Sequence, residues 1–236
     1  MTILALEFSS ARRSAAVLDR GEGSSSPLPK PDGTLTGHCP PVRLAEAVET
    51  GPGGTNAFGL IENALAGAGL QREQIESIAV GLGPGSYTGV RVALSVAQGW
   101  QLARGVKLVG VSSAECLAAQ AQVEKIWGRV NVVIDAQRNE CYLASYEISP
   151  ERFQEVQPLR IVPLAQLKPR IGADEIWVGP DATRWLPEGR NLFPSATTLG
   201  RLAAGKGGFV RGDQLTPIYL RETLFVKAPP TNRFLS

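Results

Sequence analysis

A glycine-dense segment at residues 81–91, Gly-Leu-Gly-Pro-Gly-Ser-Tyr-Thr-Gly-Val-Arg, has the clearest potential for chemistry in this sequence. It lies between the apolar run at residues 77–80 and a long apolar helical pattern. Glycine reaches positive φ without strain and proline fixes its own φ, so this composition predicts a sharp turn. Free amides in a turn that opens onto a helix can hold an anion at the positive helix end. The same turn can instead let the backbone of another protein come very close.

The spacing of these glycines does not match two phosphate-binding motifs. The pattern G-x-x-x-x-G-K-[ST] fails because its lysine and the following hydroxyl residue are missing. The glycines also do not form G-x-G-x-x-G followed by a ribose-binding acid about 20 residues on. Neither a P-loop nor a dinucleotide-binding fold is supported, and a purely structural strand-to-helix turn is the alternative to a ligand role.

Nucleophiles and metal ligands are few in this chain. The one histidine, His38, lies in a Pro/Gly-rich segment, and Cys39, Cys116 and Cys141 lack C-x-x-C spacing. We therefore predict neither a disulfide framework nor a zinc site, and we interpret the cysteines as ordinary thiols. Ser86 follows a tight turn, but G-P-G-S-Y is not the G-x-S-x-G elbow of hydrolases, and His38 is the one imidazole that could serve it.

The helix expected over residues 89–104 is apolar around most of its circumference, so it must be buried on more than one side. The face expected to pack on a sheet carries Val92, Val96 and Ala103. The face expected to need a second cover carries Val90, Leu94, Ala97 and Gln101. That cover is either another protein or a neighbouring helix of the same chain.

Composition places the chain among globular proteins. At 236 residues with 43% hydrophobic content it can bury a full core. A net charge of +2 is too mild to indicate nucleic-acid binding by itself. The N-terminus lacks signal-peptide features, and no run approaches the roughly 18 apolar residues of a membrane span. We therefore expect a cytoplasmic protein with no membrane segment.

The elements that position these residues alternate between strands and helices. Two short strands at residues 2–6 and 14–18 form a first hairpin. Residues 21–54 are rich in Pro, Gly and Ser and predict a mobile loop. The elements that follow are a helix at 55–68 with Thr55 or Asn56 as its cap, a strand at 75–80, the glycine turn, the long helix and a strand at 106–111.

The second half repeats this plan. A capping box at residues 112–115 predicts a helix to about residue 122, and strands at 130–135 and 140–147 form a second hairpin. The remaining expected elements are a short helix at 163–168, a buried strand at 175–179, a helix at 197–205 and a β-like segment at 215–221. Two such halves predict an α/β fold from a duplicated unit with mixed sheets. We place the subdomains at residues 1–110 and 111–236, with the C-terminal segment packing back on the first.

Five short segments occur in the order and spacing of a known protein family. They are Ile3–Glu7, Gly83–Arg91, Gly110–Ser113, Ile134–Ala136 with Tyr142, and Pro217–Arg221. The chain resembles the TsaB (YeaZ) family over most of its length, and the central segment is the most specific of these motifs. The resemblance implies an actin-like or Hsp70-like (ASKHA) fold. It also implies a non-catalytic scaffold role in forming N6-threonylcarbamoyladenosine at position 37 of tRNAs that read ANN codons.

The resemblance also implies partners. In that family the scaffold pairs with the metal-containing homologue TsaD, the ATPase TsaE joins them, and a separate enzyme makes threonylcarbamoyl-adenylate. We expect a heterodimer with TsaD, a homodimer when the chain is alone, and contact with tRNA through the complex. We expect no catalytic residue, metal or cofactor of the chain's own, with adenine nucleotide bound weakly or at the partner interface. The expected interface residues are Phe58, Ile61, Leu65, Gly85, Tyr87, Val90, Leu94, Ala97 and Gln101.

Three residues form a candidate vestigial nucleotide site: Glu7, Ser9 and Asp135. Glu7 stands where actin-like folds often carry an aspartate near metal and phosphate, and Asp135 stands at the matching point of the second hairpin. The turn after Asp135 lacks the glycines that would let amides wrap a phosphate, so the favoured interpretation is that each acid binds its own hairpin amides. A sugar-kinase-like ATPase of the same fold and a glycoprotease-like peptidase are the alternative functions.

Overall fold

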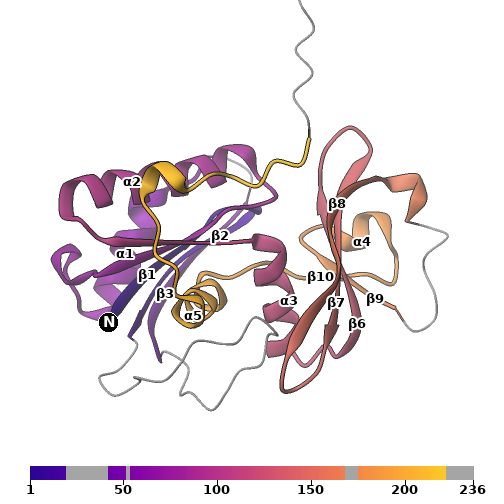
Figure 1. Ribbon diagram of the computed structural model, residues 1–236, viewed down its shortest axis with the longest axis horizontal. Coiled ribbons are helices and arrows are strands. Elements are labelled where there is room, and N and C mark those ends of the chain that lie inside the picture. Colours follow the sequence, from indigo (N-terminus) through magenta and orange to yellow (C-terminus); the bar gives the residue numbers. More distant parts are fainter. Residues whose placement is uncertain (20–41, 52–53, 168–174, 222–236) are drawn as a thin grey trace, which may run out of the picture.

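The computed structural model describes residues 1–19, 42–51, 54–167 and 175–221 (Figure 1). Within them lie two five-stranded mixed sheets with helices packed on their faces. The strands of the first sheet are β1 (Thr2–Glu7), β2 (Arg12–Asp19), β3 (Val42–Thr50), β4 (Ser77–Gly81) and β5 (Lys107–Val111). Those of the second are β6 (Gly128–Asp135), β7 (Glu140–Ile148), β8 (Phe153–Pro163), β9 (Ile176–Gly179) and β10 (Arg190–Asn191).

Both sheets follow one plan. The first has the order β3-β2-β1-β4-β5, and the second read from its other edge has the order β8-β7-β6-β9-β10. In each, three consecutive strands form an antiparallel meander, and the first of them also pairs in parallel with the fourth strand. This shared topology is the duplicated α/β unit that the two hairpins predict.

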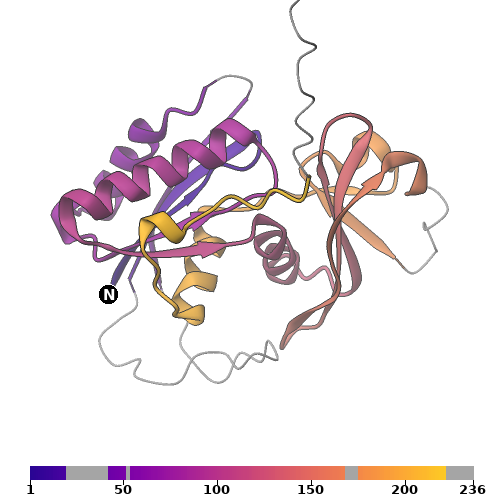
Figure 2. The same ribbon diagram turned by 45° about the horizontal axis from the view of Figure 1, so that its top comes forward.

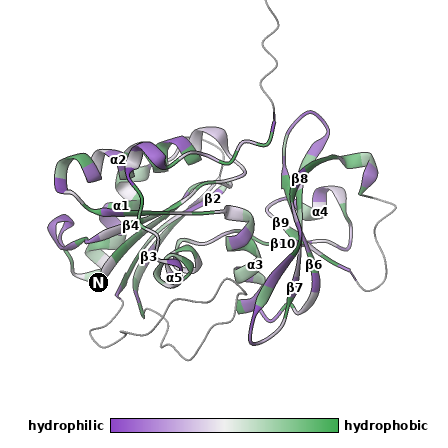
Figure 3. Cartoon of the chain, in the orientation of Figure 1, coloured by the Kyte–Doolittle hydropathy of each residue, from purple (hydrophilic) through white to green (hydrophobic). Residues whose placement is uncertain are grey.

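The helices are α1 (Ala57–Ala68), α2 (Tyr87–Arg104), α3 (Ser113–Val123), α4 (Ala182–Trp185) and α5 (Ala196–Lys206). α1 and α2 cover one face of the first sheet and α5 covers the other (Figure 1). α3 lies between the two sheets, and α4 lies on the far side of the second. The first sheet is therefore buried on both faces, which explains why β1 and β4 read as nearly continuous apolar runs. Figure 3 shows the hydrophobic residues concentrated on these central strands.

α5 lies late in the sequence but packs on the first sheet. Leu199 and Ala203 share a buried cluster with Ile3 of β1 and Leu18 of β2. Backbone of α5 comes so close that a Cβ added to Gly200 would lie 2.4 Å from Leu18 Cδ1. The chain therefore crosses between the two halves more than once, and the subdomain boundary at residue 110 stays a prediction.

The prediction that residues 21–54 are loop is wrong for β3, which pairs antiparallel with β2 along Val42–Thr50. Residues 20–41 and 52–53 lie outside the described residues, as do His38 and Cys39. β3 is an edge strand, so it has one paired neighbour, and Val42, Leu44 and Val48 are exposed. Because apolar residues of β3 are exposed and its flanks are rich in Pro and Gly, the sequence does not show the regular alternation of buried apolar and exposed polar residues that predicts a strand.

Three smaller predictions also need correction. The segment 215–221 forms no strand, since Pro217 has no amide to donate to a ladder, although Ile218 N donates to Leu82 O at 2.9 Å. β8 is absent from the predictions because Pro158 interrupts its pattern. Ser112 caps α3 without a side-chain hydrogen bond, so the capping box does not form, and Glu115 forms an ion pair with Lys206 of α5 instead.

Candidate partner-binding face and glycine turn

The glycine turn packs directly on the backbone of the β1–β2 turn. Gly85 has φ of +146°, and a Cβ at this position would lie 2.1 Å from Ser9 O. A Cβ at Gly89 would lie 1.9 Å from Phe8 O, and Ser86 N donates to Ser9 O at 2.6 Å. The close backbone approach that the glycines allow is therefore made within this chain, and it fixes the start of α2 against β1.

Ser86 is the N-cap of α2. Its hydroxyl oxygen accepts from Gly89 N at 3.2 Å, which satisfies one of the free amides at the helix start. The Ser86 hydroxyl thus stabilises the start of α2, and this capping contact explains why a hydroxyl residue follows the glycine turn.

Glu7 is fully buried beneath this turn. Its carboxylate accepts from Ser9 N at 2.9 Å and from the Ser113 hydroxyl at 3.0 Å. Gly81 gives it room, because a Cβ there would lie 2.3 Å from Glu7 Oε2. Burial raises the pKa of Glu7, while the hydrogen bonds from Ser9 and Ser113 oppose that rise.

Asp135 occupies the equivalent place in the second hairpin. It accepts from Gln137 N at 2.7 Å and from Gln137 Nε2 at 3.0 Å. Gln137, Arg138 and Asn139 all have positive φ, so this turn is held in the left-handed region by residues that are not glycine. Each acid thus binds the amide two residues after it, and a nucleotide role for Glu7, Ser9 and Asp135 stays a prediction.

The described thiols are buried. Burial, with a smaller contribution from Glu7, raises the pKa of Cys116 well above its usual range, and burial raises the pKa of Cys141 to about 12. Such thiols are poor nucleophiles because the thiolate is the reactive form. Across residues 1–19, 42–51, 54–167 and 175–221, no three His, Cys, Asp or Glu side chains gather in a way that could hold a metal ion. No described helix is long and apolar enough to cross a membrane.

The two faces of α2 are the reverse of those predicted. Val90, Leu94 and Ala97 are buried in the core under the first sheet. The C-terminal segment covers the edge of this face, because Gln101 Oε1 accepts from Gly212 N at 2.7 Å and Gln98 Nε2 donates to Gly212 O at 2.7 Å. The face predicted to need a second cover is thus the one that packs on the sheet, and a segment of this chain closes its edge. Figure 2 shows this yellow segment running beside α2 toward the second sheet.

The opposite face of α2 forms the floor of an open groove beside α1. The groove has a volume of about 740 Å³. Its apolar lining from α2 consists of Val92, Val96, Gly99, Trp100 and Ala103. α1 contributes Phe58, which is 67% exposed, and Tyr87 at the start of α2 is 55% exposed. Large exposed apolar residues that line one groove mark a surface for a partner.

Charged residues form the rim of this groove. Arg72 pairs with Glu62 at 2.6 Å, and Arg104 pairs with Glu73 at 3.6 Å. The Arg91 guanidinium lies 4.0 Å from the centroid of the Tyr87 ring and donates to Tyr219 OH at 3.1 Å. An apolar floor inside a charged and aromatic rim is the usual anatomy of a protein–protein interface.

The structure divides the nine expected interface residues into four groups. Phe58, Ile61 and Tyr87 line the groove. Leu65, Val90, Leu94 and Ala97 are buried in the core of the chain, and Gln101 binds the C-terminal segment. Gly85 lies in the turn against Ser9. Arg91, Val96 and Trp100 also line the groove but are absent from the expected set. The aromatic and arginine residues beside the apolar stripe were the available signal for them.

Comparisons with known proteins agree with this architecture. Residues 55–171 match the family model described as "TsaD: tRNA N6-adenosine threonylcarbamoyltransferase". The chain is 29% identical to the tRNA threonylcarbamoyladenosine biosynthesis protein TsaB of Escherichia coli, over 72% of this chain and 81% of that protein.

Two solved structures from Pseudomonas aeruginosa have the same fold. One, described as an uncharacterized protein with similarity to peptidase YEAZ, superposes with a TM-score of 0.73 at 25% identity, covering 93% of this chain and 99% of the other. The second, YeaZ, gives a TM-score of 0.70 at 25% identity, covering 92% and 100%. These matches and the two mixed sheets confirm the predicted α/β actin-like fold. The relatives, the solved structures and the family model together confirm that the chain resembles the TsaB (YeaZ) family.

Proposed function

We propose that this chain takes part in the biosynthesis of N6-threonylcarbamoyladenosine in tRNA. More specifically, it acts as a non-catalytic subunit in the modification of position 37 in tRNAs that read ANN codons. The similarity to TsaB proteins supports the pathway. The single observation that carries the scaffold role is the open apolar groove between α1 and α2, which offers a ready surface to a partner subunit.

The partner in this proposal is a TsaD-type subunit, which pairs with the chain through the groove. Phe58 and Tyr87 project at its edge, and Trp100 is the largest apolar residue of its floor. Aromatic residues in such positions commonly carry much of the binding energy of an interface. In the absence of that partner two copies of the chain pair through the same groove, TsaE joins the assembled complex, and tRNA is bound through it.

Several features support a subunit without chemistry of its own. The sequence contains a single histidine, and the described thiols are buried. The Ser86 hydroxyl, which a peptidase would need as nucleophile, caps α2. The amide of Ser86 is likewise occupied by Ser9 O, so this turn offers fewer donors to a phosphate than its glycine content suggests. A sugar-kinase-like ATPase and a peptidase are therefore the weaker proposals, and adenine nucleotide binds weakly or at the partner interface.

Reconstitution tests this function directly. Purified TsaD, TsaE and the adenylate-forming enzyme are combined with tRNA, with and without the chain, and the chain alone is assayed for ATP hydrolysis. We expect modification to require the chain while the chain alone hydrolyses no ATP. Modification that proceeds equally without it, together with ATP turnover by the chain alone, would replace the scaffold with the ATPase.

A groove variant with a matched control tests the pairing surface. Val96→Glu introduces a carboxylate on the groove floor, whereas Val123→Glu places the same charge on an exposed position of α3. Because a charge buried at an interface without a partner is costly, V96E should weaken binding to TsaD by about tenfold or more, and V123E should not. Equal affinities for the two variants would move the interface away from this groove.

A further inference from the structure

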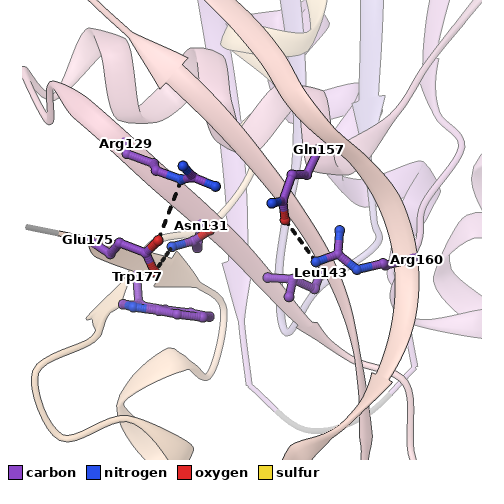
Figure 4. Close-up of a pocket in the computed structure, with 7 residues that line it drawn as sticks. All are labelled: Arg129, Asn131, Leu143, Gln157, Arg160, Glu175 and Trp177. Carbon is purple, nitrogen blue, oxygen red and sulfur yellow. Dashed lines mark hydrogen bonds and ion pairs between the residues drawn. The ribbon is translucent and has the colours of Figure 1, made fainter. Parts of the chain in front are cut away.

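A second pocket lies on the outer face of the second sheet, away from the groove. Its volume is about 480 Å³. The residues that line it are Arg129, Asn131, Leu143, Gln157, Arg160, Glu175 and Trp177 (Figure 4). Volumes of a few hundred Å³ suit small-molecule ligands.

The floor of the pocket is a row of residues that crosses four strands. Trp177 of β9 is opposite Asn131 of β6, Asn131 is opposite Ser145 of β7, and Ser145 is opposite Gln157 of β8. Asn131 is 3% exposed, Ser145 1% and Trp177 4%. Beside this row, Val133 and Val162 belong to an apolar cluster that packs against Ala182 of α4. Buried polar side chains are costly in a sheet core, so their concentration in this row calls for a ligand or a closed hydrogen-bond network.

A bulge in β8 directs two polar side chains into the same pocket. Leu143 is opposite Arg160 and Ser145 is opposite Gln157, so two steps along β7 match three along β8. In a regular strand residues three apart point to opposite faces. Here the irregularity brings them together, and Arg160 Nη2 donates to Gln157 Oε1 at 2.8 Å. Bulges that re-aim side chains are frequent beside functional sites.

The hydrogen bonds and the ion pair among the lining residues leave the pocket with an excess of positive charge and of hydrogen-bond donors. Glu175 is shared, since it pairs with Arg129 at 3.5 Å and accepts from Asn131 Nδ2 at 3.1 Å. Within the part of the chain that the structure describes, Arg160 has no carboxylate partner, and the buried Trp177 Nε1 has no acceptor. The lining thus holds two guanidinium groups and one carboxylate, and it includes Trp177, whose Nε1 is buried without a partner (Figure 4).

From this juxtaposition we infer that the pocket binds a small oxyanion, the phosphate or carboxylate group of a small molecule, with Arg160 as its main charged contact. A planar guanidinium with free N–H groups suits either group, because both offer paired oxygen acceptors. Arg129 lies across the pocket and pairs with Glu175. It therefore adds positive electrostatic potential to the pocket rather than N–H groups that are free to bind the anion. The inference is independent of the proposed function, since it concerns the opposite side of the molecule from the groove.

The test follows the four tryptophan indole N–H signals of the ¹⁵N-labelled full-length chain. Trp177→Phe assigns the signal of Trp177, and the other three serve as internal controls. Inorganic phosphate and succinate are titrated separately, with chloride at equal ionic strength as the reference. We expect a saturable shift of the Trp177 signal with at least one anion, and the anion that acts identifies the group. Absence of a saturable shift with both anions overturns the inference.

Arg160→Gln is the matched perturbation, and Arg201→Gln removes the same charge from an exposed position on α5. Loss of a charge-assisted contact should weaken anion binding by roughly tenfold or more in R160Q and leave R201Q like the unmodified chain. Equal weakening in both variants would mean a general effect of net charge and would overturn the role of Arg160. If R160Q moves the three control signals, the titration of the unmodified chain still decides whether the pocket binds an anion.

Discussion

Replacing Gly85 with alanine should destabilise the fold more than its place in a surface turn suggests. Its φ is +146°, and a Cβ here would lie 2.1 Å from the backbone oxygen of Ser9. A backbone atom cannot rotate away as a flexible side chain can. The turn must therefore move as a whole, and Ser86 N then loses its 2.6 Å hydrogen bond to the same oxygen.

The cost has two parts. A non-glycine residue in a sparsely populated backbone region costs about 1–3 kcal/mol, and loss of one hydrogen bond adds about 1 kcal/mol. We therefore expect Gly85→Ala to lower the free energy of unfolding by about 2–4 kcal/mol. In a chain of this length that corresponds to a fall in Tm of roughly 5–15 °C.

Gly105 provides the matched control. It also has positive φ, +70°, but a Cβ there meets nothing within 4 Å, so Gly105→Ala carries backbone strain alone, about 1–2 kcal/mol. Urea unfolding followed by circular dichroism measures both variants. A G85A chain that is no less stable than G105A would refute the argument that backbone contact with Ser9 constrains the turn.

Three further predictions concern other contacts. Because burial raises the pKa of Glu7, the folded chain binds the proton of this carboxyl more tightly than the unfolded chain does. The contribution of Glu7 to stability should therefore be fully present in acid and lost as pH rises through the raised pKa. Urea unfolding at several pH values should show a flatter dependence of stability on pH for Glu7→Gln than for the unmodified chain. Ser86→Ala removes the cap of α2 and should cost about 1 kcal/mol in thermal unfolding, whereas a change near zero would mean that the hydroxyl is not the cap. Arg221 is partly exposed; it pairs with Glu140 at 2.6 Å and donates to Ala136 O at 2.9 Å. Arg221→Ala should change the free energy of unfolding by less than about 1 kcal/mol but speed hydrogen exchange of the Ile218 amide, which donates to Leu82 O. Unchanged exchange would contradict the idea that the Arg221–Glu140 pair holds the C-terminal segment in place.

The elements that could be predicted from sequence are those whose signals are local. The hairpins at β1–β2 and β6–β7 follow from short apolar runs around polar turns, and the cap at Asn56 follows from a side chain that reaches an amide three residues away. The sharp glycine turn likewise follows from composition, because Gly85 must reach a backbone conformation that other residues avoid.

What could not be predicted depends on distant partners. β3 becomes a strand because β2 offers it a free edge, and its exposed valines carry no alternation to reveal that pairing. The pocket on the second sheet depends on the register of four strands and on a bulge in β8. The spacing of Gln157 and Arg160 along the chain would place their side chains on opposite faces, so periodicity argues against the contact that they make.

α2 shows why an apolar pattern alone does not assign faces. Its two apolar stripes are nearly equivalent in sequence, so their burial depends on what the rest of the chain can cover. Gln101 distinguishes the two stripes, because its side chain is hydrogen-bonded to Gly212, 111 positions away, and to the carbonyl of Val106. The sequence predicts Gln101 as part of a partner surface, yet its side chain satisfies internal backbone groups. The middle of the stripe with Val96 and Trp100 binds no returning segment within the part of the chain that the structure describes, and it is left open as the groove. The arginines at its two ends do make such contacts, Arg91 with Tyr219 and Arg104 with the backbone of Glu73. In α2 the exposed apolar face therefore lies between two such polar contacts, whereas the stripe that contains Gln101 is closed by returning backbone.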